Sequence, residues 1–285
     1  SSQGWSTTLK SIVKRPGNTA DYAVEFNDSV LVDGGGNYTK LLPALNFAYD
    51  LTDRLRLRFA ASKAIARPTF GELSPASDAT NASSGTFIIF DAGNPNLKPT
   101  TADQLDLSLE YYAGSRFALT GAVFYKKIRD FVTSAPVAVT ITPTDQPAGA
   151  PPTFDFTRVE VMNGDSANVF GVEVGGQYFL DNGFGIQANA TYNRSRAKSG
   201  TITTDLPGAI PFSANLKLFY ENHGVHAQVS YNYASRYTQA QANLIDYLPI
   251  KEDPYHEMSA SLAYDLTEHF QVYVEGSNLL GSAIK

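Results

Sequence analysis

Few side chains in this sequence could catalyse a reaction or hold a metal ion. The 285 residues include no cysteine, which excludes disulfides and thiolate metal sites. His223 and His226 are close in sequence, but we expect one in a turn and the other on a strand, without a carboxylate at ligand spacing. The sequence contains no Gly-x-Ser-x-Gly motif and no phosphate-binding glycine loop. We therefore predict no catalytic residue, no metal site and no cofactor.

Binding by aromatic and polar side chains is the chemistry that remains. Aromatic rings beside amides and charged groups suit stacking on sugar rings, or contacts with catechol and peptide groups. We expect four loop aromatics and four polar side chains to contact a ligand: Phe87, Phe90, Tyr237, Tyr247, Arg58, Lys126, Asn193 and Arg236. The alternative for each residue is structural, because loop aromatics often pack within their loop and interior charges often pair with a neighbouring domain.

Strands with period-two alternation have to position these residues. From Gln104 to Tyr112 the odd positions are Leu, Leu, Leu and Tyr, whereas the even positions are Gln, Asp, Ser, Glu and Tyr. This alternation predicts a strand with one apolar and one polar face. Similar patterns predict about eleven strands in all, at residues 20–31, 42–50, 54–64, 104–112, 117–126, 168–180, 184–196, 211–221, 225–237, 255–265 and 269–279.

The connections between these strands alternate between short turns and long loops. Turns of three to five residues follow every second strand, and the longer connections include residues 66–99, 136–155 and 237–254. A soluble sandwich would also show alternating strands, but its hairpins would not be so regularly long and short. Long strands with short turns at one end and long loops at the other are typical of an outer-membrane barrel.

The polar faces of the strands indicate a wet interior. Arg54, Arg56 and Arg58 share one strand face, and such charges need water or carboxylates in front of them. No stretch approaches 18 apolar residues, so the sequence predicts no transmembrane helix. We predict an all-β fold, an antiparallel transmembrane β-barrel whose apolar rows contact lipid and whose polar rows face the lumen.

Aromatic residues gather beside the short turns. Amphipathic rings settle at the headgroup level, so this clustering predicts an aromatic girdle at the rim that carries the short turns. The alternative is that aromatic residues are simply good strand formers. The residues concerned are Tyr49, Tyr111, Tyr112, Phe117, Tyr178, Phe179, Phe184, Phe219, Tyr220, Tyr264 and Phe270.

The net charge of the chain and the residues at its start narrow the possible functions further. The net charge of −6 comes with no basic stripe, which argues against a nucleic-acid partner. The sequence has neither an initiator Met nor a signal peptide at Ser1, so we expect a mature chain or a fragment.

Several stretches resemble the C-terminal barrel half of TonB-dependent outer-membrane receptors. The resemblance covers about residues 38–285, and Asn94-Pro95-Asn96-Leu97-Lys98-Pro99 is its most specific part. The other stretches are Ala60 to Pro68, Asn163-Gly164, Gly171-Val172-Glu173 and Gly276 to Leu280.

The resemblance implies a barrel of 22 strands in the bacterial outer membrane, plugged by an N-terminal domain and driven by the TonB complex. The strands expected here would then be the eleventh to the twenty-first, and residues 1–285 would form a partial barrel domain without plug, TonB box or closing strand. Glu110, Glu173 and the three arginines are expected to contact the plug. An odd number of strands does not close a bacterial single-chain barrel, which also favours a fragment.

Three functions follow as hypotheses. The first is TonB-coupled import of a scarce nutrient, either a ferric siderophore or an oligosaccharide. The second is a passive porin, which needs neither an energy source nor a plug. The third is a barrel enzyme, which would need a Ser/His/Asp or paired-Asp cluster that the sequence does not supply. The expected partners are outer-membrane lipid, the receptor's own plug, the TonB complex and the imported substrate.

Overall fold

The regular structure of the described residues consists of β-strands alone in the computed structural model. The structure describes residues 2–14, 22–74, 77–80, 88–91, 93–142, 144–145, 147–149, 153–240 and 250–282. These residues include no helix that could span a membrane. Two residues expected to bind a ligand, Phe87 and Tyr247, lie outside the described residues.

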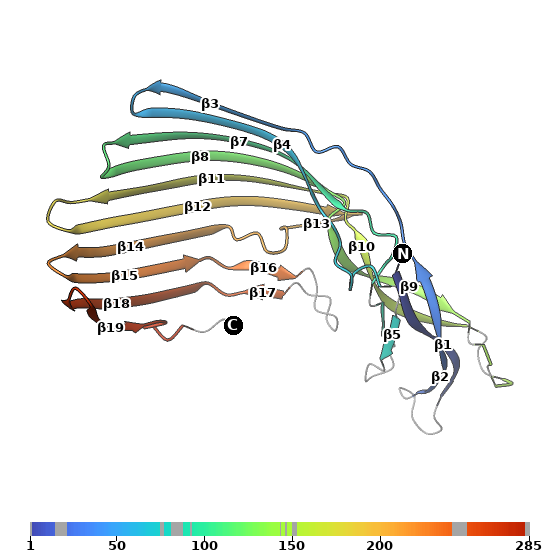
Figure 1. Ribbon diagram of the computed structural model, residues 1–285. Helices are drawn as coiled ribbons and strands as arrows, with labels where there is room; N and C mark the ends of the chain where they lie inside the picture. Colours follow the sequence, from blue (N-terminus) through green and yellow to red (C-terminus); the bar gives the residue numbers. More distant parts are fainter. Residues whose placement is uncertain are drawn as a thin grey trace.

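The main sheet is a curved array of long antiparallel strands (Figure 1). Short turns join its hairpins at one end, and the longer connections leave from the other, which we call the loop end. The order is β19-β18-β15-β14-β12-β11-β8-β7-β4-β3, and β13 pairs with β12 off this path. Its strands are β3 (Ala44–Thr52), β4 (Leu55–Ala66), β7 (Thr100–Ala113), β8 (Phe117–Arg129), β11 (Ser166–Phe179), β12 (Phe184–Ser199), β13 (Ile202–Thr204), β14 (Phe212–Asn222), β15 (Val225–Ala234), β18 (Tyr255–Thr267) and β19 (Phe270–Gly276).

The main sheet is open, with β3 and β19 as its two edges. In hydrocarbon an unpaired strand edge leaves backbone N–H and C=O groups without partners, and each such group costs several kcal/mol. A sheet of this kind therefore has to be completed by further strands when it lies in a membrane. The expected all-β antiparallel barrel architecture is confirmed as a partial barrel.

A second sheet lies beyond the loop end of the main sheet (Figure 1). Its order is β2-β1-β5-β6-β10-β9, and a separate two-stranded ribbon pairs β16 with β17. Its strands and those of the ribbon are β1 (Ser2–Lys14), β2 (Tyr22–Gly34), β5 (Ser77–Thr80), β6 (Ile88–Asp91), β9 (Val132–Ile141), β10 (Phe154–Asn163), β16 (Tyr237–Ala240) and β17 (Ile250–Glu252).

The second sheet corrects two expectations about the connections. The strand expected at 20–31 is present as β2, but it pairs with β1 instead of joining the main sheet. The stretch 136–155, expected to be a loop, begins and ends in strands, because β9 and β10 pair from Val132–Asn163 to Ile141–Phe154. Pro136 is tolerated in β9 because this strand is an edge of its sheet, where one N–H row needs no partner.

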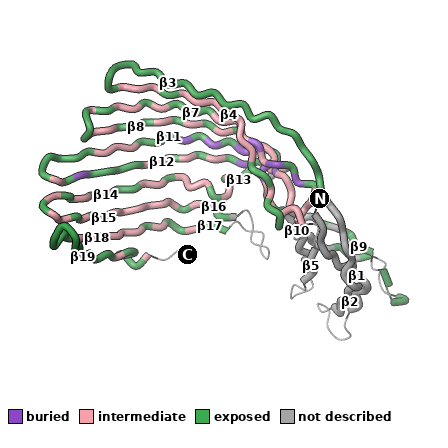
Figure 2. Tube along the Cα trace, in the orientation of Figure 1, coloured by how far each residue is buried: buried purple, intermediate pink, exposed green. Residues whose placement is uncertain are grey.

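The apolar row of each main-sheet strand is uncovered. Leu107 is 44% exposed, Val174 51% and Val229 39%. Figure 2 shows that buried positions are few and gather mainly at the loop ends of β11 and β12. A soluble sandwich would bury these rows against a second layer, and no described residues form such a layer over them. We call this surface the outer face and the opposite one the inner face.

The aromatic girdle beside the short turns is present on the outer face. Rings of neighbouring strands touch there: the centroids of Tyr111 and Phe117 are 6.1 Å apart, and those of Phe184 and Tyr220 are 4.7 Å apart. Three residues expected in the girdle, Tyr112, Phe179 and Phe219, point to the inner face instead because their positions have the opposite parity. The outer-face members are Tyr49, Tyr111, Phe117, Tyr178, Phe184, Tyr220 and Tyr264.

A second girdle, not expected from the sequence, crosses the outer face nearer the loop end. Its rings are Tyr125, Phe170, Tyr192 and Phe212, each eight positions along its own strand from a ring of the first girdle. Eight steps of about 3.3 Å cover about 26 Å along a strand, which is of the order of the apolar band of an outer-membrane barrel. The two girdles therefore mark the two membrane interfaces.

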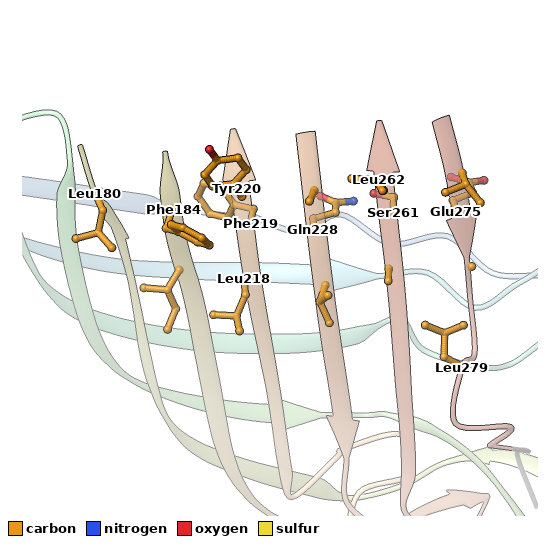
Figure 3. Close-up of a pocket in the computed structure, with 17 residues that line it drawn as sticks. Leu180, Phe184, Leu218, Phe219, Tyr220, Gln228, Ser261, Leu262, Glu275 and Leu279 are labelled. Atoms are coloured by element: carbon orange, nitrogen blue, oxygen red, sulfur yellow. The ribbon is translucent and has the colours of Figure 1, made fainter. Parts of the chain in front are cut away.

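A hollow of about 850 Å³ also opens on the outer face, near the β19 edge (Figure 3). Its wall is almost entirely apolar and includes Leu218 of β14, Leu262 of β18 and Leu279 beyond the end of β19. Because it belongs to the lipid-facing surface and lies where the sheet stops, we do not count it as a site for a polar ligand.

Replacing Leu107 by Arg should destabilise the full-length protein by roughly 2–4 kcal/mol, because Leu107 lies midway across the apolar band. Ala122→Arg, on the inner face opposite Ser108 and Glu173, should have little effect. Urea unfolding of the protein folded in lipid vesicles measures both. Equal loss of stability in the two variants would contradict the assignment of the faces.

Candidate functional site: the inner face and its loop end

The inner face carries a continuous polar surface. Neighbouring strands meet there through side-chain hydrogen bonds, with Asn215 Nδ2 donating to Asn189 Oδ1 at 2.7 Å and Ser230 Oγ lying 2.7 Å from Ser259 Oγ. Alternation at the inner positions puts amides, hydroxyls and charges on five or more adjacent strands. Such a wall can line a water-filled bore and offer donors and acceptors to a polar solute.

Near the short turns this surface is neutralised within the sheet itself. Arg56 donates from Nε and Nη2 to the two carboxylate oxygens of Asp50, at 2.5 and 3.1 Å. Arg58 donates from Nε to Glu110 Oε1 at 2.8 Å, and the Tyr112 hydroxyl donates to the other oxygen of Glu110 at 3.0 Å. Arg58 thus lies close to the Asp53–Arg54 turn and already has a partner, well away from the loop end where a ligand would arrive.

Two inner-face lysines lie over phenylalanine rings that in turn lie over glycines. Lys126 Nζ is 5.2 Å from the ring centre of Phe124, and Lys217 Nζ is 5.8 Å from that of Phe219. A Cβ on Gly171 would come within 2.1 Å of the Phe124 ring, and one on Gly185 within 2.1 Å of the Phe219 ring. Because neither glycine has a side chain, both rings can lie across the neighbouring strand.

The two lysine–phenylalanine pairs differ in height. Lys126 lies near the loop end of β8, whereas Lys217 is the central residue of β14. Lys126 therefore places a positive charge on the inner face near the loop end, the position that the sequence predicted. Phe124 was not among the residues predicted to bind a ligand, although a Phe two positions before Lys126 in the inner row of β8 is a signal that could have indicated it.

Asn193 and Arg236 also reach the loop end of the inner face. The Asn193 N–H donates to the Pro211 carbonyl, and its side-chain Nδ2 donates to the Ile210 carbonyl at 3.2 Å. Asn193 Oδ1 is buried and makes no hydrogen bond within the described residues. Arg236 pairs with Asp253 at 2.5 Å, across the base of the ribbon that Tyr237 begins. Lys126, Asn193, Arg236 and Tyr237 thus share one end of the sheet, while Arg58 does not.

Phe90 lies in the second sheet. Its backbone in β6 pairs with Asp78 of β5 and Val159 of β10.

The stretches Asn94–Pro99 and Asn163-Gly164 fasten the loops to the main sheet. The Asn163 side chain accepts from the Lys98 N–H at 2.8 Å and donates to the carbonyls of Lys98 and Asp130 at 2.9 and 2.8 Å. Asn94 Nδ2 donates to the Val161 carbonyl at 3.0 Å. These bonds join the start of β7 to the end of β10. Asn94–Pro99 and Asn163-Gly164 thus form a hydrogen-bonded platform at the base of the loops.

A small core lies under this platform. It contains Phe131, Ala167 and Ala197, with Ile128 and Leu206 packed against them. Gly164 sits against the Phe131 ring, and a Cβ there would come within 2.3 Å of it. Phe131 is only 7% exposed, so the ring has little room to move.

The part of the chain that the structure describes holds no cluster of side chains with the make-up of a metal site. Within it, no three His, Asp or Glu side chains gather in a way that could hold a metal ion. His226, one of the two neighbouring histidines, lies 3.0 Å from Asp265, which also accepts a hydrogen bond from Gln271.

A family model described as "TonB dependent receptor-like, beta-barrel" matches residues 15–279. The chain belongs to the TonB-dependent receptor family. Members of this family are receptors and transporters, not a class of enzyme, and a passive porin is not favoured.

Comparisons of this TonB-dependent receptor chain with individual proteins are consistent with the family assignment. It is 32% identical over 129 residues to the iron-regulated outer membrane virulence protein of Vibrio cholerae serotype O1, over 44% of this chain and 19% of the relative. A variant of the ferric enterobactin receptor PfeA of Pseudomonas aeruginosa superposes with a TM-score of 0.63 at 18% identity, over 84% of this chain and 34% of that one. The siderophore receptor PirA of Acinetobacter baumannii gives 0.64 at 16%, over 88% and 38%.

The receptor chain therefore spans about a fifth of its curated relative and about a third of the solved structures that it matches. The solved structures show the fold, and together with the family match they place the chain in the wall of an outer-membrane barrel.

Gly164→Ala should destabilise the packing at the base of the receptor's loops by about 1–3 kcal/mol, because the new methyl group overpacks the Phe131 ring. Limited proteolysis of the full-length protein should show faster cleavage in the β9–β10 hairpin. Gly71→Ala is the matched control, since a Cβ at that glycine meets no atom within 4 Å. Unchanged cleavage in Gly164→Ala would contradict the role of this contact.

Proposed function

We propose that the chain forms part of a receptor that imports a ferric siderophore across the outer membrane, driven by the TonB complex. The observation that carries this proposal is the family match over residues 15–279, together with a relative that is named for iron regulation. The solved structures that resemble the chain add fold-level support, since one is named a ferric enterobactin receptor and another a siderophore receptor.

The inner face has the chemistry that such a cargo would use. A ferric chelate is a polar, often anionic solute that carries ring or carbonyl groups. At the loop end it would meet the Lys126 ammonium above the Phe124 ring, the Asn193 amide and the Tyr237 ring. A cation held over an aromatic ring offers charge attraction and a stacking surface in the same place.

A plug domain would complete the inner face, both below this level at Glu173 in mid-β11 and near the loop end of β18 at Glu257. Glu173 and Glu257 point inward from β11 and β18, and neither has an ion-pair partner among the described residues. We propose that basic groups of the plug supply their partners. Arg56, Arg58 and Glu110, which were expected to contact the plug, are already satisfied within the sheet, so their contribution to plug binding should be smaller.

Deleting the full gene should abolish growth on one or more ferric siderophores as sole iron source, and removing TonB should have the same effect. The measurement is growth and radiolabelled-iron uptake in cells that carry the full-length protein. Uptake that persists without TonB would indicate a passive pore. Loss of growth on an oligosaccharide, with iron uptake intact, would reassign the cargo and leave the energised transport standing.

Lys126→Gln should weaken binding of the cognate ferric chelate by roughly 3- to 10-fold, because about 1 kcal/mol of charge attraction is lost. Lys217→Gln is the matched control, since this lysine lies on the same face, over a phenylalanine, but farther from the loop end. Fluorescence titration of the purified full-length variants measures both. Equal effects would contradict the assignment of binding to the loop end.

A further inference from the structure

A group of basic residues lies on the outer face, just beyond the second aromatic girdle. Lys127 follows Tyr125 by two positions on β8, and Arg194, Arg196 and Lys198 follow Tyr192 on β12. We call these four residues the outer basic group. Cross-strand register aligns Asn168 of β11 with Lys127 on one side and with Arg196 on the other. The four cations therefore form one patch across three adjacent strands.

The orientation of this patch rests on contacts as well as on alternation. The Tyr125 hydroxyl donates to Asn168 Oδ1 at 2.8 Å, so a ring of the second girdle and the centre of the patch lie on the same face. Arg194 is in register with Phe170, which is 46% exposed on the outer face. The patch thus faces away from the lumen and does not belong to the ligand-binding surface proposed above.

The four cations have no acidic partner among the described residues. Asp103, in register with Lys127, already pairs with Arg129 at 2.8 Å and with Lys63 at 3.4 Å. Asp165 follows the buried Gly164 and accepts a hydrogen bond from the Gly200 N–H at 2.9 Å. All four basic residues are exposed. A cluster of like charges on a chain whose net charge is −6 points to an anionic partner outside the sheet.

An apolar hollow adjoins the patch on its membrane side. It has a volume of about 500 Å³, and its lining includes Leu45, Ala61, Leu105 and Tyr125 together with Lys63, Asp103 and Lys127. Ala61 lies between Leu45 and Leu105 in register, and its small side chain leaves the space open. Lys63 is paired with Asp103, so among the described residues Lys127 is the unpaired cation beside this apolar hollow. An apolar hollow next to the basic patch matches a molecule that has acyl chains and a negatively charged headgroup.

We propose that this surface binds a phosphorylated lipid of the outer leaflet. Its acyl chains occupy the hollow above Ala61, and its headgroup phosphates are held by Lys127, Arg194, Arg196 and Lys198. The second aromatic girdle sets the depth of the patch in the membrane, because the patch begins two residues along the strand from the rings that mark the interface. This inference depends on the outer face being the lipid face, and it does not depend on which nutrient the receptor imports.

The test uses the full-length protein, refolded into detergent without lipid and titrated with diphosphoryl lipid A or with the same lipid stripped of its phosphates. Native mass spectrometry counts the bound lipid. The wild type should prefer the phosphorylated form at least tenfold. The variant K127Q/R194Q/R196Q/K198Q should lose this preference, since each exposed charge contributes on the order of fivefold. The double variant K126Q/K217Q, which removes two charges from the inner face, should keep it.

A second variant tests the hollow without altering charge. Ala61→Phe should fill the hollow and lower the affinity for diphosphoryl lipid A, while heat-modified mobility on gels confirms that the barrel is folded. Equal binding of both lipids by the wild type, or an unchanged preference in the fourfold variant, would overturn the proposal. Displacement of the lipid by inorganic phosphate at millimolar concentration would show a simple anion site and would also overturn it.

Discussion

The structure depends on one constraint, that a strand crossing a membrane must satisfy its backbone in the sheet and present a different surface to each solvent. The first requirement is met by continuous antiparallel pairing from β3 to β19. The second produces period-two alternation, so that Leu107 lies on the lipid face while Ser108 lies on the inner face. The girdles, the polar inner wall and the outer basic group all take their positions from this alternation.

At the loop end the sheet no longer has one lipid-facing and one water-facing surface, and a small hydrophobic core forms there. Phe131, Ala167 and Ala197 are nearly inaccessible to solvent, and Asn163 joins segments 65 positions apart in sequence. Long loops lose much conformational entropy when they are ordered, so a fixed base is needed if they are to present a defined surface to a ligand. The residues proposed to bind the cargo, Lys126 and Asn193 among them, lie next to this base.

Much of the main sheet could be predicted from the sequence because its strands obey a local rule. Lipid on one side and water on the other leave a signal in every second residue, as in β7 and β8. The second sheet leaves no such signal: β9 contains Pro136, and its residues do not alternate in polarity. Strand pairing over long separations, as between β6 and β10, depends on contacts that a single local pattern does not encode.

The candidate site was predictable only in part, for the same reason. Alternation placed Lys126 and Asn193 correctly on the inner face, and their strands brought both to the loop end. It could not show that Arg58 pairs with Glu110 or that Phe124 lies over Gly171, because those contacts cross strands. The motif Asn94–Pro99 was recognised from sequence, but its hydrogen bonds to the end of β10 required the fold.

The orientation of the two faces can be measured directly with spin labels along β14. Single cysteines at positions 213 to 219 of the full-length protein in vesicles would each carry a nitroxide, and this part of the chain has no cysteine of its own. The account predicts maxima of oxygen accessibility at Ala214, Leu216 and Leu218, with minima at the residues between them. Accessibility without a two-residue period, or with its maxima at Asn215 and Lys217, would contradict it.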